Sequence, residues 1–271
     1  MSTQPGSGEP DGTGPVIGPS VAHPARVYDY WLGGKDNYPA DRHAAEQAIQ
    51  ALPDIAVYAR ANRAFLARVV RFLAGEAGIR QFLDIGTGIP TSPNVHEVAQ
   101  AADPTSRIVY VDNDPIVLVH ARALLTSHPQ GATAYLDCDL RDPDRILKLA
   151  AGTLDFTHPV AVLLLATLQL IPDSDDPYQI VARLLDGAPS GSYLAVSHPA
   201  KDIHAQASAE AAERLNQLHV DVTLRNRAEV ARFFDGLDLV EPGLVQVHRW
   251  RPGQASPAGE VTIHASVARK P

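Results

Sequence analysis

The chain has 271 residues, of which 45% are apolar and 20% charged, the composition of an ordinary soluble globular protein with one large α/β domain or two small ones. A net charge of −8 at pH 7 disfavours binding to a nucleic-acid backbone, which usually requires a basic face. The single cysteine, Cys138, excludes an intramolecular disulfide and a cysteine-based metal cluster, and no apolar run is long enough to predict a membrane span.

The first 22 residues are rich in Gly, Pro, Ser and Thr. Such a segment cannot bury enough apolar surface to offset the entropy lost on ordering, so we expect residues 1–22 to be a disordered tail. The same residues lack the basic and apolar regions of a secretion signal. We therefore expect the protein to be cytoplasmic.

Apolar runs alternate with helical patterns along the rest of the chain. Strands are predicted at 81–85, 107–112, 132–137, 159–166, 191–197, 237–247 and 260–268. Helices are predicted at 39–50, 54–75, 93–102, 114–126, 142–151, 177–187, 202–217 and 226–235. The alternation predicts a doubly wound α/β sheet. Only a loop, 250–260, separates the last two strands, so we expect these strands to be antiparallel at one edge.

The sequence DIGTG follows directly after the first predicted strand, with Asp84, Gly86, Thr87 and Gly88 at its turn. Glycine permits positive φ and lets a ligand approach the backbone closely. A dinucleotide fingerprint needs a third glycine where Thr91 stands, and no Gly-Lys-Ser/Thr of a P-loop follows. The pattern favours a ligand without phosphates, bound where ligands of open α/β sheets lie, at the carboxyl ends of the strands.

Acidic residues follow the next two strands. Asp112 ends the second strand and can accept hydrogen bonds from two ribose hydroxyls, while Asp139 and the Leu140 amide follow the third and can bind an adenine edge. Asn113 and Ala166, at the ends of the second and fourth strands, are further candidates. Taken alone, Asp84 also fits a residue that stiffens the turn, and Asp112 and Asp139 also fit helix caps. The ordered combination predicts a nucleoside pocket.

Several longer blocks carry a family resemblance: HPARVYDYWLGGKDNYPADR (23–42), QFLDIGTGIPTSPNVHEVAQ (81–100), VYVDNDPIVL (109–118) and PDSDDPY (172–178). With them the sequence resembles the class I S-adenosylmethionine-dependent methyltransferases. It is most similar to an actinobacterial S-adenosyl methyltransferase family formerly listed as a domain of unknown function.

The resemblance covers nearly all of the chain from His23 onward and implies a Rossmann-like, seven-stranded doubly wound sheet with an antiparallel edge strand. We expect an N-terminal helical cap (23–75) followed by an S-adenosylmethionine-binding domain (76–271). S-adenosylmethionine would lie at the carboxyl edge of the sheet, with Asp84, Gly86 and Gly88 along its methionine portion.

Two stretches depart from the family pattern. Relatives often carry a His-Phe pair where Gln169 and Leu170 stand here, and many end in a glycine-rich strand where this chain has IHASVARKP (263–271). Both departures concern the acceptor pocket, so the sequence leaves the acceptor open.

The block ARVYDYWLGGKDNYPADR packs aromatic residues, charges and a glycine pair into 18 positions. One interpretation is a cap that closes over the cofactor and excludes water, with Arg26 and Tyr28 near the ligand. The alternative is a helical extension that packs its aromatic residues on the sheet. On the next helix, Arg63 is a candidate to pair with the cofactor carboxylate, or else to form a solvated surface pair.

Methyl transfer from a sulfonium is an in-line displacement that depends mainly on positioning, and a base is needed only if the acceptor keeps a proton. His198 is the first candidate for that base, because histidine titrates near neutral pH, and Tyr28 of the cap is the second. No histidine pair has metal-ligand spacing, so no metal is expected.

The sequence leaves three functions open. We expect a methyltransferase acting on a small-molecule acceptor; its oligomeric state is not predicted. The alternative is an S-adenosylmethionine-binding protein with other chemistry or a regulatory role. A nicotinamide-dependent oxidoreductase is disfavoured by the missing third glycine.

Overall fold

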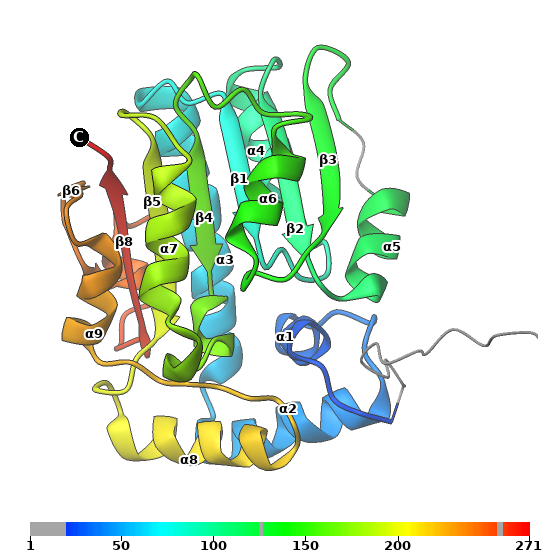
Figure 1. The fold of residues 1–271 in the computed structure, drawn as a ribbon. Helices are drawn as coiled ribbons and strands as arrows, with labels where there is room; N and C mark the ends of the chain where they lie inside the picture. The colour runs from blue at the N-terminus through cyan, green and yellow to red at the C-terminus, as the bar shows by residue number, and fades with distance from the viewer. Residues whose placement is uncertain (1–19, 125–126, 254–256) are drawn as a thin grey trace, which may run out of the picture.

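A mixed β-sheet forms the centre of the computed structural model, which describes residues 20–124, 127–253 and 257–271 (Figure 1). Within these residues the strand order is β3-β2-β1-β4-β5-β8-β6, and β7 also pairs with β8. The strands are β1 Gln81–Ile85, β2 Arg107–Asp112, β3 Ala132–Asp137, β4 Ala161–Leu165, β5 Tyr193–Pro199, β6 Asp238–Leu239, β7 Val245–Gln246 and β8 Ile263–Arg269. The first five are mutually parallel, and β8 runs antiparallel to β5.

Apolar side chains on both faces of the central strands build two cores. Successive residues of a strand point to opposite faces, so Phe82 of β1 packs with one core and Leu83 with the other. The Phe82 side is covered by α3 (Ile55–Arg71) and α4 (Val95–Ala102), and the Leu83 side by α6 (Pro143–Ala150), α7 (Pro177–Asp186) and α9 (Arg227–Ala231). Helix α5 (Pro115–Leu124) lies beside β2 and β3. The predicted doubly wound α/β fold is confirmed.

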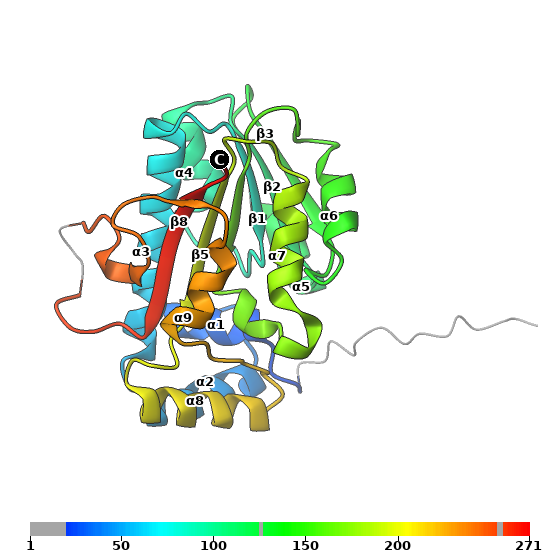
Figure 2. The same cartoon turned by 60° about the vertical axis from the view of Figure 1, so that its left-hand side comes forward.

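A third layer closes the carboxyl ends of the parallel strands. It consists of α1 (Pro24–Leu32), α2 (Pro39–Ala51) and α8 (Ala205–Gln217), which lie below the sheet in Figures 1 and 2. Helices α2 and α8 pack side by side, and the Arg214 guanidinium of α8 donates hydrogen bonds to Gln47 O at 3.3 Å and Gln50 Oε1 at 3.0 Å. Segments far apart in the sequence therefore cover the edge where the sequence predicts the ligand.

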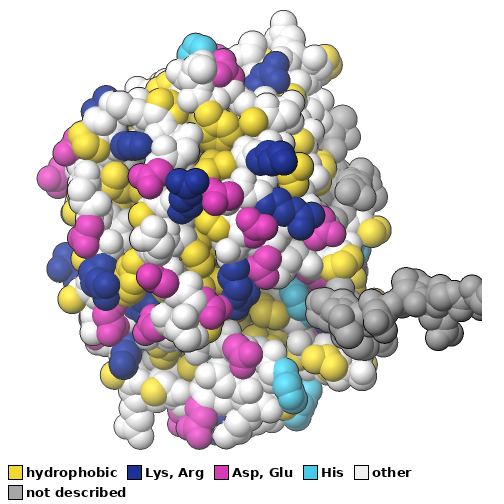
Figure 3. All heavy atoms as spheres, viewed as in Figure 1, with side chains coloured by type: hydrophobic (Ala, Val, Ile, Leu, Met, Phe, Trp, Pro, Cys, Tyr) yellow, Lys and Arg dark blue, Asp and Glu magenta, His cyan; other side chains and the backbone are white. Residues whose placement is uncertain are grey.

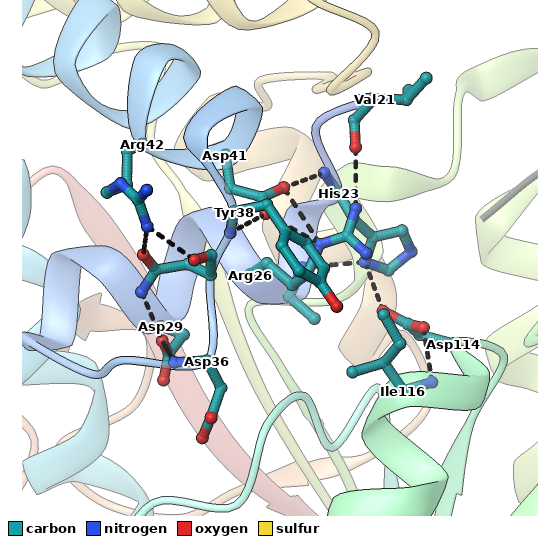
Figure 4. Close-up of polar contacts among 12 residues, drawn as sticks. Val21, His23, Arg26, Asp29, Asp36, Tyr38, Asp41, Arg42, Asp114 and Ile116 are labelled. Atoms are coloured by element: carbon teal, nitrogen blue, oxygen red, sulfur yellow. Dashed lines mark hydrogen bonds and ion pairs between the residues drawn. The ribbon is translucent and has the colours of Figure 1, made fainter. Parts of the chain in front are cut away.

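A buried carboxylate holds the N-terminal part of this layer together (Figure 4). Asp41, fully buried, accepts hydrogen bonds from His23 N at 2.8 Å, Tyr38 N at 2.7 Å and Arg26 Nε at 3.1 Å. The Arg26 side chain is only 2% exposed. His23 Nδ1 in turn lies 3.0 Å from Asp114 Oδ2, which joins the start of α1 to the residue before α5.

Gly33 and Gly34 follow α1, and each position requires glycine for a different structural reason. Gly33 ends α1 with φ of 82°, a left-handed conformation that side chains disfavour. At Gly34 a Cβ atom would come within 1.9 Å of Asp29 Oδ1. Asp29 occupies that space because its carboxylate accepts from Asp36 N at 3.0 Å and Asn37 Nδ2 at 2.8 Å, closing the loop between α1 and α2.

Several observed elements differ from the predicted ones: α1 is not among the predicted helices, and the predicted helix 226–235 is divided into α9 and a 3-10 turn, Arg232–Phe234. The predicted strand 237–247 is interrupted into β6 and β7, because Pro242 has no N–H for the ladder and Gly243 turns with φ of 79°. The predicted helix 54–75 ends as α3 at Arg71 and continues as a π-helical turn, Phe72–Glu76. Parts of three predictions lie outside the described residues: 1–19 of the tail, 125–126 of a helix and 254–256 of a loop.

Acidic and basic side chains are interspersed on the face of the molecule shown in Figure 3. Of the helices described, none combines the length and the apolar character that crossing a membrane requires.

The contribution of the buried Asp41–Arg26 pair to the stability of the N-terminal layer can be tested by mutation. Asp41→Ala leaves the Arg26 charge buried without its partner, so we expect the free energy of unfolding to fall by roughly 3 kcal/mol in urea titrations. Asp144→Ala is the matched control, because Asp144 and Arg183 form an ion pair that is exposed on both sides and should contribute less than about 1 kcal/mol. Equal losses in the two variants would contradict this account of the layer.

Candidate active site

The turn after β1 is clamped between the two strands that flank it. Gly86 N donates to Val111 O of β2 at 2.8 Å, and Thr167 Oγ1, just after β4, donates to Ile85 O at 3.0 Å. Gly86 has φ of 73°, and a Cβ atom there would lie 2.4 Å from Thr167 Cγ2. Both the conformation and the neighbouring side chain therefore require glycine at this position.

The second glycine of the turn is held by the carboxylate at the end of β2. Gly88 N donates to Asp112 Oδ2 at 2.9 Å, and Asp114 N donates to the other oxygen, Oδ1, at 2.9 Å. Burial raises the pKa of Asp112, although these two amides favour its ionised form. A Cβ atom on Gly88 would meet nothing within 4 Å, so the backbone here faces open space.

The residues after β3 form the outer rim. Asp139 accepts from Asn113 Nδ2 at 3.1 Å and from its neighbour Arg141 N at 2.8 Å. The Arg141 guanidinium also pairs with Asp175 at 2.6 Å, which links the rim to the segment after β4. Leu140 is buried beside this exposed network.

These strand ends surround one cavity of about 330 Å³. Its wall contains most of the predicted site residues: Tyr28, Arg63, Asp84, Gly86, Thr87, Gly88, Asp112, Asn113, Asp139, Leu140 and Ala166. Helix α1 covers the cavity from one side with His23 and Trp31. The other side is covered by Leu215 of α8 and by residues 219–222 that follow it.

Two predicted site residues lie elsewhere. Arg26 does not line the cavity, because its guanidinium is bound to Asp41 beneath α1. His198 is fully buried away from the cavity, where Nδ1 lies 2.9 Å from Pro199 O and Nε2 lies 2.9 Å from Arg225 Nη1. Burial, with the Arg225 charge, lowers the pKa of His198 to about 3. The expectation that His198 acts as a base does not fit this position.

Tyr28 lines the cavity, but its hydroxyl is already bonded. It donates to Ala59 O at 3.1 Å and accepts from Asn62 Nδ2 at 3.0 Å, and Asn62 Oδ1 accepts from Ser197 Oγ at 2.6 Å. Burial raises the pKa of Tyr28. A protonated, doubly bonded phenol supports the shape of the cavity better than it supports proton abstraction.

The sequence interpretation missed several residues that line the cavity. His23, Cys138 and the segment 219–222 all line the cavity. Cys138 had a detectable signal, since it directly precedes Asp139 at the end of β3. The segment 219–222 had none, because it reaches the cavity only through the packing of α8 against α2.

Two ionisable groups of the cavity wall, Asp84 and Arg63, influence each other electrostatically. Burial raises the pKa of Asp84 to about 7; the Arg63 charge acts against this rise and Asp112 adds to it. The Arg63 guanidinium donates through Nη2 to Thr91 O and, at 2.8 Å, to Pro93 O, while its buried Nε has no hydrogen-bond partner. An unpartnered buried N–H beside a cavity is a donor available to a ligand.

Comparison with known proteins decides the family. A model of the S-adenosyl methyltransferase family matches residues 12–271. The chain belongs to this family of S-adenosylmethionine-dependent methyltransferases. A search of curated proteins found no match.

Solved structures agree with this assignment. A DUF574 family protein from Streptomyces avermitilis is 49% identical, with a TM-score of 0.90 over 93% of this chain and 98% of that chain. A proposed methyltransferase from Thermobifida fusca is 40% identical, with a TM-score of 0.85 over 93% and 96%. Human N-acetylserotonin methyltransferase, solved in complex with S-adenosylmethionine, is similar in fold. It is 13% identical, with a TM-score of 0.51 over 93% of this chain and 63% of that chain.

The shifted carboxyl of Asp84 gives a test based on folding stability. Its pKa in the folded protein, about 7, exceeds the ordinary 3.8, so its ionised form opposes folding most strongly above pH 7 and less as pH falls. We expect Asp84→Asn to raise the free energy of unfolding by up to roughly 4 kcal/mol at pH 8, and by less than half of that at pH 5, in urea titrations without ligand.

Asp137→Asn is the control, because Asp137 is exposed at the end of β3, two strands away from β1 in the sheet. It should change stability by less than about 0.5 kcal/mol at either pH. Equal effects of the two variants, or an effect of Asp84→Asn that grows toward pH 5, would contradict the raised pKa.

Proposed function

We propose that this methyltransferase transfers the methyl group of S-adenosylmethionine to a small-molecule acceptor by in-line displacement. The observation that carries the proposal is the meeting of two cavities. An apolar chamber of about 110 Å³ adjoins the larger cavity, and Tyr28, Trp31, Ala166 and Gln169 are among the residues that line both. A cofactor in the larger cavity would thus have a separate space beside it for a second reactant.

The residues of the larger cavity suit S-adenosylmethionine. Asp112 offers carboxylate oxygens for ribose hydroxyls, and Asp139 with Leu140 forms a rim for the adenine edge. The open backbone at Gly88 permits close approach of the ligand. The unpartnered Nε–H of Arg63 is a donor for the cofactor carboxylate. The pocket offers carboxylates for hydroxyls and an amino group but no phosphate-binding loop.

The protein's part in the reaction is mainly geometric. When bound, S-adenosylmethionine supplies a sulfonium methyl with a neutral thioether as the leaving group. Trp31 and Tyr28 of α1, together with Leu215 and Val222, separate the reactants from solvent and hold the acceptor beside the cofactor cavity. Ala166, at the junction, has φ of 56°, an unusual conformation for a residue with a side chain. Gln169 Nε2 stabilises this conformation by donating to Ala166 O at 2.6 Å.

The size and lining of the apolar chamber support a small acceptor rather than a macromolecule. The chamber is lined by α1, α3, α8 and the ends of β5 and β8, so it is surrounded by elements from all parts of the fold. Its volume, about 110 Å³, is of the same order as the roughly 150 Å³ of an engineered protein cavity that holds one benzene ring.

Two measurements test the proposal. Calorimetric titration should show saturable binding of S-adenosylhomocysteine; absence of heat at millimolar ligand would rule out the cofactor site. Incubation of a cell extract with the protein and methyl-labelled S-adenosylmethionine should place label in the low-molecular-weight fraction. Label confined to the protein or nucleic-acid fraction would contradict a small-molecule acceptor.

The placement of the ribose has its own test. Asp112→Ala should weaken binding of S-adenosylhomocysteine by about 1–3 kcal/mol, because ribose hydroxyls lose their acceptor and Gly88 N loses its partner. Asp137→Ala is the matched control, since Asp137 pairs in register with Asp112 on the adjacent strand but does not line the cavity. Unchanged affinity of a folded Asp112→Ala protein would show that the ribose lies elsewhere.

A further inference from the structure

The chamber beside the cofactor cavity is almost entirely apolar. Its wall is built from side chains such as Leu52, Ile55, Ala211, Val222 and Ile263. Among the described residues that line it there is no Asp, Glu, Lys, Arg or His. A charged group of an acceptor would therefore lose its hydration here without a counter-charge, which is strongly unfavourable.

Gln169, a residue at the junction of the two cavities, carries one polar atom that has no hydrogen-bond partner. Gln169 lines both cavities, and its Oε1 is buried with no hydrogen-bond partner, whereas its Nε2 donates to Ala166 O at 2.6 Å. The bond to Ala166 fixes which end of the amide carries the free oxygen. A buried amide oxygen left unbonded costs free energy that a donor on a ligand would recover.

The backbone around Gln169 is held on both sides. Arg225, only 1% exposed, donates from Nη1 to Leu168 O at 2.9 Å and from Nη2 to Ile171 O at 2.8 Å. Thr223 N donates to Gln169 O at 2.8 Å. Gln169 Oε1 thus sits on a rigid turn, as a positioned acceptor should.

No base is available on the chamber wall. Its ionisable residues are Tyr28 and Tyr58, and burial raises the pKa of both phenols, so both stay protonated at neutral pH. Of the ionisable residues that line the larger cavity, only Tyr28 is shared with the chamber, and its proton is donated to Ala59 O. A hydroxyl acceptor, which must lose its proton as it attacks, finds no group there to receive it.

On the basis of the proposed function, we infer that the acceptor is a neutral amine with a compact apolar substituent. Its N–H donates to Gln169 Oε1, and its apolar part fills the chamber. The nitrogen lone pair forms the N–C bond as the C–S bond breaks and the sulfur takes that electron pair. The product is an N-methyl ammonium that passes its extra proton to water on release, so the step needs no protein base.

A matched set of probes tests this inference on the full chain loaded with S-adenosylhomocysteine at pH 7.5. Aniline, phenol, toluene and benzoate share one ring and differ in the group presented to Gln169. Ligand-observed NMR should show aniline and phenol binding about tenfold more tightly than toluene, and benzoate most weakly. With S-adenosylmethionine, N-methylaniline should form from aniline, and phenol should yield no anisole.

Gln169→Leu keeps the side-chain volume and removes the oxygen, so it should abolish the preference for aniline over toluene. Gln179→Leu, at an exposed position on α7, should leave the preference unchanged. The inference is overturned if aniline fails to bind, if toluene binds as tightly as aniline to the unmodified protein, or if anisole forms as fast as N-methylaniline.

Binding of S-adenosylhomocysteine is measured first in every variant, which separates this inference from the proposed function. Loss of that binding in the unmodified chain contradicts both. Binding of the cofactor product, with methyl transfer to another class of small molecule and none to aniline, contradicts the amine acceptor alone.

Discussion

The site depends on the hydrogen bond between the Gly88 amide and the Asp112 carboxylate, which joins the turn after β1 to the end of β2. The bond holds a stretch of open backbone at the cavity, beside a buried carboxylate that lines the same cavity. Because Gly86 is fixed at the same time between Val111 O and Thr167, three strands hold one turn. A preorganised turn of this kind loses little entropy when a ligand binds.

Buried charged groups lie at this turn and in the N-terminal layer. Asp84 lines the cavity with a pKa that burial raises, and a buried carboxyl of this kind costs folding free energy in its ionised form. In the cap, the opposite arrangement holds. Arg26 and Asp41 are buried as a bonded pair, and they stabilise the start of α1 so that His23, Tyr28 and Trp31 reach the cavity. Among the described residues the buried Asp84 carboxyl thus has no bonded partner of opposite charge, whereas Arg26 and Asp41 form a buried pair that supports the N-terminal layer.

The third layer, formed by α1, α2 and α8, distinguishes this protein from a nucleotide-binding sheet whose strand ends are uncovered. Helices α1 and α2 from the N-terminal part and α8 with residues 219–222 from the C-terminal half meet over the strand ends (Figure 2). Their contact encloses a polar cavity and an apolar chamber that share a boundary at Gln169 and Ala166. Enclosure makes the few polar atoms on that boundary decisive, because in an apolar surrounding each unbonded donor or acceptor carries a large cost.

The sequence by itself determined the alternation of strands and helices, the doubly wound sheet, and the cluster of Asp84, Gly86, Gly88, Asp112 and Asp139 at one edge. These are local signals: apolar periodicity, glycine turns and strand-terminal aspartates, all read within a few residues. Tertiary structure alone decided that His198 lies beneath Arg225, that Arg26 turns to Asp41, and that residues 219–222 cover the cavity. Those outcomes depend on which side chains come into contact after the helices pack. Contacts between residues far apart in the sequence produce no periodic pattern from which they could be predicted.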